Sequence, residues 1–251
     1  MEKIAHIIKT ALTVLLTGGI IGGLAYGAHQ YVLRINLFGL ERIVISGSAL
    51  VSNEEILTLA RAPYGKSLFR IPPDSVQRRV ATNPFINAVS VSRQFPRTLY
   101  IQVHEREPIA YINAGELLCM DRTGFIMPLP PEGPQLGIPI LSGLNHTDSL
   151  IVGAPAPTTQ IQKMVDILKG IRADYPGLYP QISELVSNEE NEFILFTAEN
   201  ATRIYLGKDN LSRKIHLLEA FWSTVGTERS WKDYQYIDLR YRRQVIVREH
   251  T

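Results

Sequence analysis

The residues that could do chemistry in this chain are few and scattered. No two of its histidines have the H-x-x-x-H or H-E-x-x-H spacing that places two zinc ligands on one helix face. His104 lies near Glu105 and Glu107, but the alternation of a strand puts His104 and Glu105 on opposite faces. We therefore expect a solvated strand end there and no metal site. The histidines are His6, His29, His104, His146, His216 and His250.

Candidate nucleophiles and carboxylate pairs are equally sparse. Cys119, the single cysteine, lies in an apolar segment, which predicts an inert buried thiol and excludes an internal disulfide. Asp121-Arg122-Thr123-Gly124 has the form of an aspartic-protease loop, but that chemistry needs a second carboxylate and the sequence holds no second copy. A hairpin turn is the better interpretation. Without a nucleophile elbow, P-loop or dinucleotide fingerprint, the sequence predicts no catalytic residue, no metal ligand, no cofactor and no enzyme activity.

Composition narrows the class of protein further. The chain has 251 residues, 45% of them hydrophobic, which is enough for one large or two small packed domains. Its 26 basic and 24 acidic residues leave a formal net charge of +2. That charge is too small to indicate nucleic acid as a partner.

One apolar segment near the N-terminus is long enough to cross a bilayer. Residues 10–33 contain no Lys, Arg, Asp or Glu and are bracketed by Lys9 and Arg34. A spanning helix needs about 20 such residues. A cleaved signal peptide is the alternative, with small residues at Gly27 and Ala28, but the run continues beyond them and favours an uncleaved anchor. We expect a single-pass type II protein with residues 1–9 in the cytoplasm and the bulk outside, because large domains translocate largely regardless of flanking charge.

The span is rich in glycine at small-xxx-small spacing. Gly18 and Gly22, like Gly23 and Gly27, are four residues apart, a spacing that lets two helix backbones approach in lipid. This pattern allows weak self-association through the span. Glycine is also common in membrane helices generally, and the sequence leaves both interpretations open.

Short alternating elements follow the span. The period of the apolar residues and the turn-forming residues between them predict the order strand, helix, helix, strand, strand. Phe95-Pro96-Arg97 supplies the turn between the last two strands. The strands are expected at residues 43–45, 89–92 and 99–104, and the helices after the capping box at Ser52 and between Pro72 and Pro84.

From Tyr111 the pattern becomes mostly strands with two helices, so the fold class is α+β. A proline-rich loop is expected at residues 128–139. Strands are predicted at 117–120, 125–127, 182–186, 192–196, 202–206, 236–241 and 244–248, and helices over 161–171 and 211–225.

The final strand is the best candidate for a binding surface. Nothing substantial follows residues 244–248, so we expect a sheet edge whose backbone N–H and C=O groups are free to pair with an incoming peptide. Alternation places Val245 and Val247 on one face of this strand. Gln244, Ile246 and Arg248 then lie on the other face.

Several motifs in this order resemble the bacterial FtsQ/DivIB cell-division family. They are Ile45-Ser46-Gly47, Asn83-Pro84-Phe85, Phe95-Pro96 and the acidic-Arg-acidic-Pro exit at residues 105–110, followed late in the chain by Tyr236-Ile237-Asp238-Leu239-Arg240-Tyr241. The resemblance implies a cytoplasmic tail at 1–9, a transmembrane helix at 10–33, a polypeptide-transport-associated (POTRA) domain at 38–110 and a β domain at 111–251.

The resemblance also implies a function and partners. The family is a non-catalytic divisome scaffold of the inner membrane and division septum, whose last strands receive FtsB (DivIC) and with it FtsL. Arg240 and Tyr241 match the family's positions beside that strand, whereas Arg242-Arg243 departs from the usual small or acidic turn. The alternative function is a polypeptide chaperone or translocation component. Tandem POTRA modules would indicate that role, and the sequence shows one.

A second contact is implied in the POTRA domain. The strand at residues 87–93, with Val89, Val91 and Arg93, would meet other division proteins including FtsK. The alternative interpretation is that this strand is simply an internal strand of the sheet.

Overall fold

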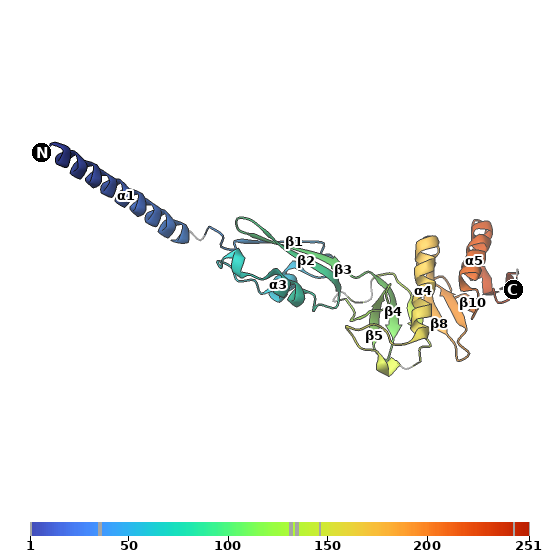
Figure 1. Ribbon diagram of the computed structural model, residues 1–251. Helices are drawn as coiled ribbons and strands as arrows, with labels where there is room; N and C mark the ends of the chain where they lie inside the picture. The colour runs from blue at the N-terminus through green and yellow to red at the C-terminus, as the bar shows by residue number, and fades with distance from the viewer. Residues whose placement is uncertain are drawn as a thin grey trace. The chain divides into compact units, whose positions relative to one another are not determined.

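The computed structural model describes residues 2–34, 37–130, 133, 136–145, 147–242 and 244–250, and the chain divides into two compact units, residues 1–104 and 105–251 (Figure 1). The first unit begins with the long helix α1 (Glu2–Arg34). Its segment Leu12–Tyr31 has a mean hydropathy of 1.3 and no buried residue, so α1 is one helix able to span a membrane and is not a core helix.

The rest of the first unit is a small sheet with two helices packed against it. The sheet order is β1-β3-β2, with β1 parallel to β3, and α3 packs on β2. Ile56 and Ala60 of α2 and Val76 and Val80 of α3 are buried in the core. The elements are β1 (Arg42–Ser46), α2 (Asn53–Ala60), the 3-10 helix η1 (Leu68–Arg70), α3 (Pro73–Val80), β2 (Ile86–Gln94) and β3 (Thr98–Glu105).

Local chemistry explains where these elements begin and end. The Ser52 side chain accepts a hydrogen bond from Glu55 N at the start of α2, as its capping sequence predicts. Pro73 occupies the first turn of α3, where a backbone N–H has no helical partner to lose. Gly47 ends β1 with φ of 86°, and a Cβ there would lie 2.1 Å from the Val103 carbonyl oxygen. Only glycine fits that close approach to β3.

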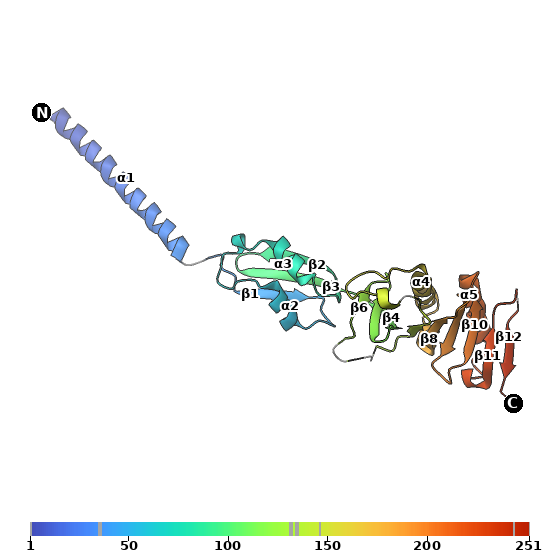
Figure 2. The same ribbon diagram turned by 90° about the horizontal axis from the view of Figure 1, so that it is seen from below.

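The second unit is built on one nine-stranded sheet of order β12-β11-β10-β9-β8-β7-β4-β5-β6. Helices α4 (Thr159–Asp174) and α5 (Leu211–Val225) lie side by side against it (Figures 1 and 2). Their apolar faces and the sheet share a single hydrophobic core. The strands are β4 (Pro108–Asn113), β5 (Leu117–Asp121), β6 (Ile126–Met127), β7 (Ile140–Ser142), β8 (Ile182–Ser187), β9 (Phe193–Thr197), β10 (Arg203–Gly207), β11 (Tyr234–Asp238) and β12 (Ile246–Glu249), with short 3-10 helices η2 (Thr147–Ser149), η3 (Tyr179–Gln181) and η4 (Trp231–Asp233).

The predicted turn at Asp121 is a hairpin turn and is also the centre of a buried polar cluster. Asp121 Oδ1 accepts hydrogen bonds from the backbone N–H groups of Thr123 and Phe125 and from the Thr123 hydroxyl. Its Oδ2 lies 2.7 Å from Nη1 of Arg106. The Arg106 guanidinium also lies 3.5 Å from the centroid of the Phe125 ring. The carboxylate therefore closes the β5–β6 hairpin and anchors the segment that enters β4.

The structure differs from the sequence-based expectations in several strands. Strands β4 and β7 were not expected, and β4 pairs with both β5 and β7. The strand expected at 236–241 is wrong at both ends. It runs from Tyr234 to Asp238, because the Asp238 side chain accepts from Arg240 N and turns the chain there. Part of the proline-rich loop (131, 132, 134 and 135) and Arg243 lie outside the described residues.

Candidate partner-binding edge

The last strand lies at a free edge of the large sheet, as the sequence predicts. Strand β12 pairs with β11 alone and is antiparallel to it, with Val247 opposite Ile237 and Ile246 opposite Asp238. In the part of the chain that the structure describes, no strand lies on its outer side (Figure 2). Its far end is held by a hydrogen bond of 2.9 Å from His250 N to Asp233 O and by an ion pair between Glu249 and Arg229.

The opposite edge of the same sheet is covered. Ile126 of β6 donates its N–H to Ala154 O, and its carbonyl accepts from Gly153 N, each at 2.9 Å. Phe125 also forms a bridge with Pro155. The loop at residues 153–156 thus occupies the backbone groups that β6 would otherwise present. Because an unprotected edge invites pairing with another chain, this asymmetry marks β12 as the open edge.

The side chains predicted to bind a partner lie along β12 and the connection before it, in the terminal hairpin formed by β11 and β12. Ile246, Val247 and Arg248 lie in β12 and are exposed, and Gln244 is exposed just before it. Val245 is half-buried and packs against the hydrophobic core, which anchors the start of the strand. Tyr241 lies in the connection between β11 and β12 and is 54% exposed. Apart from Val245, these side chains face solvent and can be reached by another molecule.

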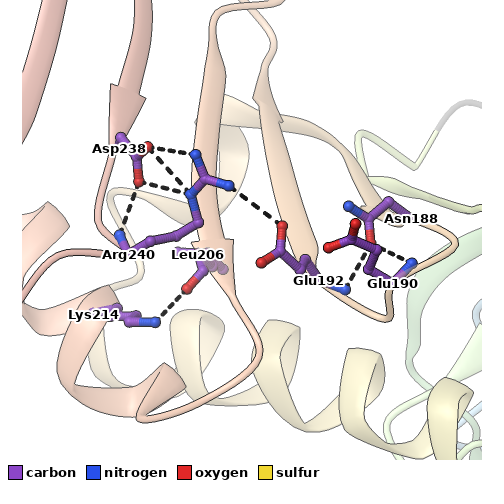
Figure 3. Close-up of polar contacts among 7 residues, drawn as sticks. All are labelled: Asn188, Glu190, Glu192, Leu206, Lys214, Asp238 and Arg240. Atoms are coloured by element: carbon purple, nitrogen blue, oxygen red, sulfur yellow. Dashed lines mark hydrogen bonds and ion pairs between the residues drawn. The ribbon is translucent and has the colours of Figure 1, made fainter.

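Arg240 is held beside this edge by a carboxylate two residues earlier (Figure 3). Its Nη2 lies 2.7 Å from Oδ2 of Asp238, and its Nε lies 3.0 Å from Oδ1. The backbone N–H of Arg240 also donates to Asp238 Oδ1 at 2.9 Å. A fork of this kind fixes the plane of the guanidinium as well as its position.

Asp238 is nearly buried, with 5% of the residue's surface exposed. Burial by itself would raise its pKa. The hydrogen bonds from the side chain and backbone of Arg240, together with the positive charges of Arg240 and Lys214, outweigh burial and hold the pKa below its ordinary value. The same partnership raises the pKa of Arg240, so its positive charge is permanent.

Arg240 also reaches across the sheet to strands β9 and β10. Its Nη1 lies 3.4 Å from Oε2 of Glu192, at the end of the β8–β9 turn, where Glu192 N donates to Asn188 Oδ1 (Figure 3). Its guanidinium lies 5.0 Å from the centroid of the Tyr205 ring on β10. Arg240 therefore links the connection between β11 and β12 to two neighbouring strands.

A small basic hollow of about 210 Å³ lies next to Arg240 and Tyr241 at the start of α5. Lys214 in its wall donates to Leu206 O at 2.6 Å and so holds the first turn of α5 to β10 (Figure 3). Because basic side chains outnumber acidic ones in its wall, the hollow would favour an acidic group on a partner bound beside it. The hollow is lined by Asp209, Asn210, Arg213, Lys214, Leu217, Arg240, Tyr241 and Arg242.

The strand predicted as a second contact, β2, is also an edge strand. It pairs with β3 alone, so among the described residues it is not an internal strand. Val89 is buried, Val91 is half-buried, and Arg93 donates to Ile71 O at 2.8 Å. A partner at this edge would therefore meet the backbone of β2 and its exposed alternate residues rather than the side chains of Val89 and Arg93.

Cys119, the candidate nucleophile, lies in surroundings typical of a buried structural residue. Cys119 is buried, and the loss of solvent raises its pKa to about 11, so the thiol stays protonated at neutral pH. Among the described residues, no three His, Cys, Asp or Glu side chains are close enough to hold a metal ion.

Three members of the site escaped the sequence analysis. Strand order brings Glu192 and Tyr205 to Arg240, and Lys214 reaches the site from helix α5. The Asp-x-Arg spacing of Asp238 and Arg240 was a usable signal, because an aspartate often hydrogen-bonds the backbone two residues later.

Comparison with known proteins agrees with this architecture. The POTRA domain, FtsQ-type, matches residues 38–106, and the domain described as FtsQ/DivIB, C-terminal related, matches residues 107–247. A Geobacter sp. (strain M21) cell division protein FtsQ is 31% identical over 90% of this chain and 83% of its own length. The FtsQ proteins of Geotalea daltonii and Rhodothermus marinus are each 29% identical, over 99% and 97% of this chain and 88% of their own lengths. On the strength of two adjoining domain matches and relatives that align over most of their length, this chain belongs to the FtsQ/DivIB family of cell-division proteins.

Proposed function

We propose that this protein is a divisome scaffold that binds FtsB (DivIC), and with it FtsL, by adding a strand of the partner to β12. The single observation that carries the proposal is the contrast between the two edges of the large sheet, one covered by residues 153–156 and the other open. An added strand gains main-chain hydrogen bonds from the edge, and neighbouring side chains provide selectivity.

The side chains around β12 offer two kinds of selectivity for a partner, apolar contacts and electrostatic contacts. Ile246 and Val247 offer apolar contacts on the two faces of the added strand, since successive side chains alternate. Arg240, already oriented by Asp238, and the basic hollow beside Tyr241 favour an acidic residue in the partner. A pre-oriented cation costs the complex less ordering than a mobile one.

Helix α1 supports a membrane location. We infer a single-pass type II protein of the inner membrane, with residues 1–9 in the cytoplasm and the POTRA and β domains outside, concentrated at the division septum. The small-xxx-small glycines of α1 support weak self-association within the membrane. The open edge of β2 is our candidate for a second contact, with FtsK or another division protein.

Binding of the 251-residue chain in detergent to the FtsB ectodomain tests the main proposal. Ile246→Lys and Tyr241→Ala should each weaken binding about tenfold or more, because one places a charge among the edge contacts and the other removes a large aromatic surface. Ile151→Lys is the matched control, since Ile151 is equally apolar and strongly exposed but lies near the covered edge.

Unchanged affinity in both edge variants would exclude β12 as the FtsB site. A fluorescent fusion in dividing cells tests the cellular role separately. The scaffold predicts accumulation at midcell, whereas a chaperone or translocation component would give a uniform envelope signal.

A further inference from the structure

Three phenylalanine rings form an exposed cluster at one end of the POTRA domain. Phe38, Phe69 and Phe95 lie with ring centroids 5.1, 5.2 and 6.0 Å apart. They come from three separate segments, the residues before β1, the 3-10 helix η1 and the β2–β3 turn. Phe69 is 58% and Phe95 is 56% exposed. Apolar side chains that gather at the surface and remain uncovered generally mark an interaction site.

The segment that carries Phe38 is fixed into the domain by backbone hydrogen bonds. Leu68 N donates to Phe38 O at 2.7 Å, and Leu40 N donates to Lys66 O at 2.9 Å. Arg97 Nε donates to Leu37 O at 3.2 Å. The folded domain therefore begins at Leu37, and the position of Leu37 sets the position of this end of the domain.

Leu37 is tethered close to the end of the membrane helix. Helix α1 ends at Arg34, so three Cα–Cα steps of 3.8 Å separate it from Leu37, a reach of at most about 11 Å. The apolar segment itself ends at Tyr31, and three helical residues add about 5 Å along the axis. The headgroup layer outside the hydrocarbon core is about 5–8 Å thick. Whatever the domain's orientation, Leu37 lies at most about 16 Å from the end of the apolar segment, so the chain carrying Phe38 starts within the headgroup layer or within about 10 Å of it.

The chemistry around the cluster suits that level. Aromatic rings are enriched where hydrocarbon meets headgroups, and Tyr64 adds another exposed ring on the loop that Gly65 N fastens to Leu40 O. Lys66 and Arg70, which follow in the same segment, are exposed and can meet anionic headgroups. Apolar rings flanked by cations are the pattern of an interfacial anchor.

We propose that the cluster of Phe38, Phe69 and Phe95 inserts into the lipid interface beside α1 and docks this end of the POTRA domain on the membrane. The proposal rests on α1 spanning the membrane, as inferred above. It gives the domain a defined orientation, because β2 then begins far from the bilayer and ends at Phe95 on its surface. Eight residues separate Asn87 from Phe95, about 26 Å along the strand.

Tryptophan depth measurements on the full chain in phosphatidylcholine–phosphatidylglycerol vesicles test the proposal. Phe95→Trp places a reporter in the cluster with little change of shape, and Asn87→Trp is the matched control at the exposed far end of β2. The signal of the native Trp222 and Trp231 is measured in the parent protein and subtracted. Lipids brominated near the glycerol end of the acyl chains should quench the tryptophan at 95 several-fold more than the one at 87.

A second variant separates insertion from mere proximity. Phe69→Asp in the Phe95→Trp background places a charge in the cluster and should reduce quenching toward the level of the control. Quenching at 95 no greater than at 87, or unaffected by Phe69→Asp, would overturn the proposal. Flotation with the vesicles after alkaline extraction reports separately on α1. A chain that does not float refutes the anchor and the docking together, whereas one that floats without selective quenching refutes the docking alone.

Discussion

Asp238 and Arg240 form a bidentate ion pair at the point where β11 ends, with side-chain contacts of 2.7 and 3.0 Å. The backbone N–H of Arg240 also donates to the Asp238 carboxylate at 2.9 Å. Asp238 is nearly buried, whereas Arg240 is 41% exposed. The pair therefore has a nearly buried member that fixes the chain and a more exposed member whose guanidinium lies toward Glu192 and Tyr205, on the side of β11 opposite to β12. A residue expected to meet a partner is thus already engaged within the protein, which makes it an oriented cation rather than a free one.

Replacing Arg240 should lower the free energy of unfolding moderately. Arg240→Met leaves Asp238 with one backbone hydrogen bond in place of a bidentate pair, and we expect a loss of about 1–3 kcal/mol in the free energy of unfolding. Tyr241→Ala, next in the chain and exposed, is the control and should change stability by less than about 0.5 kcal/mol. Thermal unfolding of the full chain in detergent gives both values. Equal stability of the two variants would show that the pair does not support the hairpin.

Stability should fall at acid pH because two buried carboxylates have lowered pKa values. Burial alone would raise the pKa of Asp121, but hydrogen bonds from Thr123, Arg106 and Phe125 hold it below its ordinary value, as Arg240 does for Asp238. A lowered folded pKa gives stability that is present above the unfolded pKa of about 3.9 and is lost as pH falls through the folded pKa.

Thermal unfolding followed from neutral pH to below pH 4 measures this loss. Asp238→Asn should be less stable than the parent at neutral pH and show a shallower decline on acidification. A decline as steep as that of the parent would exclude Asp238 as a source of the pH dependence.

Substitutions of Arg106 and Asp121, which form a buried ion pair, should have non-additive effects on the free energy of unfolding. Their side chains are 13% and 4% exposed, so Arg106→Met leaves an uncompensated carboxylate at a cost of about 3–5 kcal/mol. Asp121→Asn is expected to cost stability too, because it weakens the hydrogen bonds to Thr123 and Phe125. The double variant should be more stable than the sum of the two losses predicts. Strict additivity in a double-mutant cycle would refute a direct interaction.

Gly143 should tolerate no side chain. It follows β7 with φ of 69°, and a Cβ would lie 2.0 Å from the Ser187 carbonyl oxygen of β8. Gly143→Ala should therefore destabilise the protein by more than about 1 kcal/mol, through backbone strain and separation of the two strands. Gly177→Ala is the control, since a Cβ at Gly177 meets no atom within 4 Å. Similar melting temperatures for the two variants would contradict the close approach.

Much of the local structure could be predicted from sequence because its causes are local. The capping hydroxyl of Ser52, the proline that begins α3 and the helical spacing of Ile161, Met164 and Leu168 each act within a few residues. The turn at Asp121 follows from side-chain contacts two and four residues away. The short strand β7 could not be predicted, because three residues show no period and its strand character comes from pairing with β4 and β8.

The sequence alone determined the apolar helix long enough to span a membrane, the types of most helices and strands, and the motifs of the family. Tertiary structure decided that β11 pairs in parallel with β10, that residues 153–156 cover β6, and that Arg240 meets Glu192 and Tyr205. It also brought Phe38, Phe69 and Phe95 together. The physical reason is that periodicity records which side of an element is buried, whereas the neighbour of each strand edge is chosen by hydrogen bonds and packing between residues far apart in the chain.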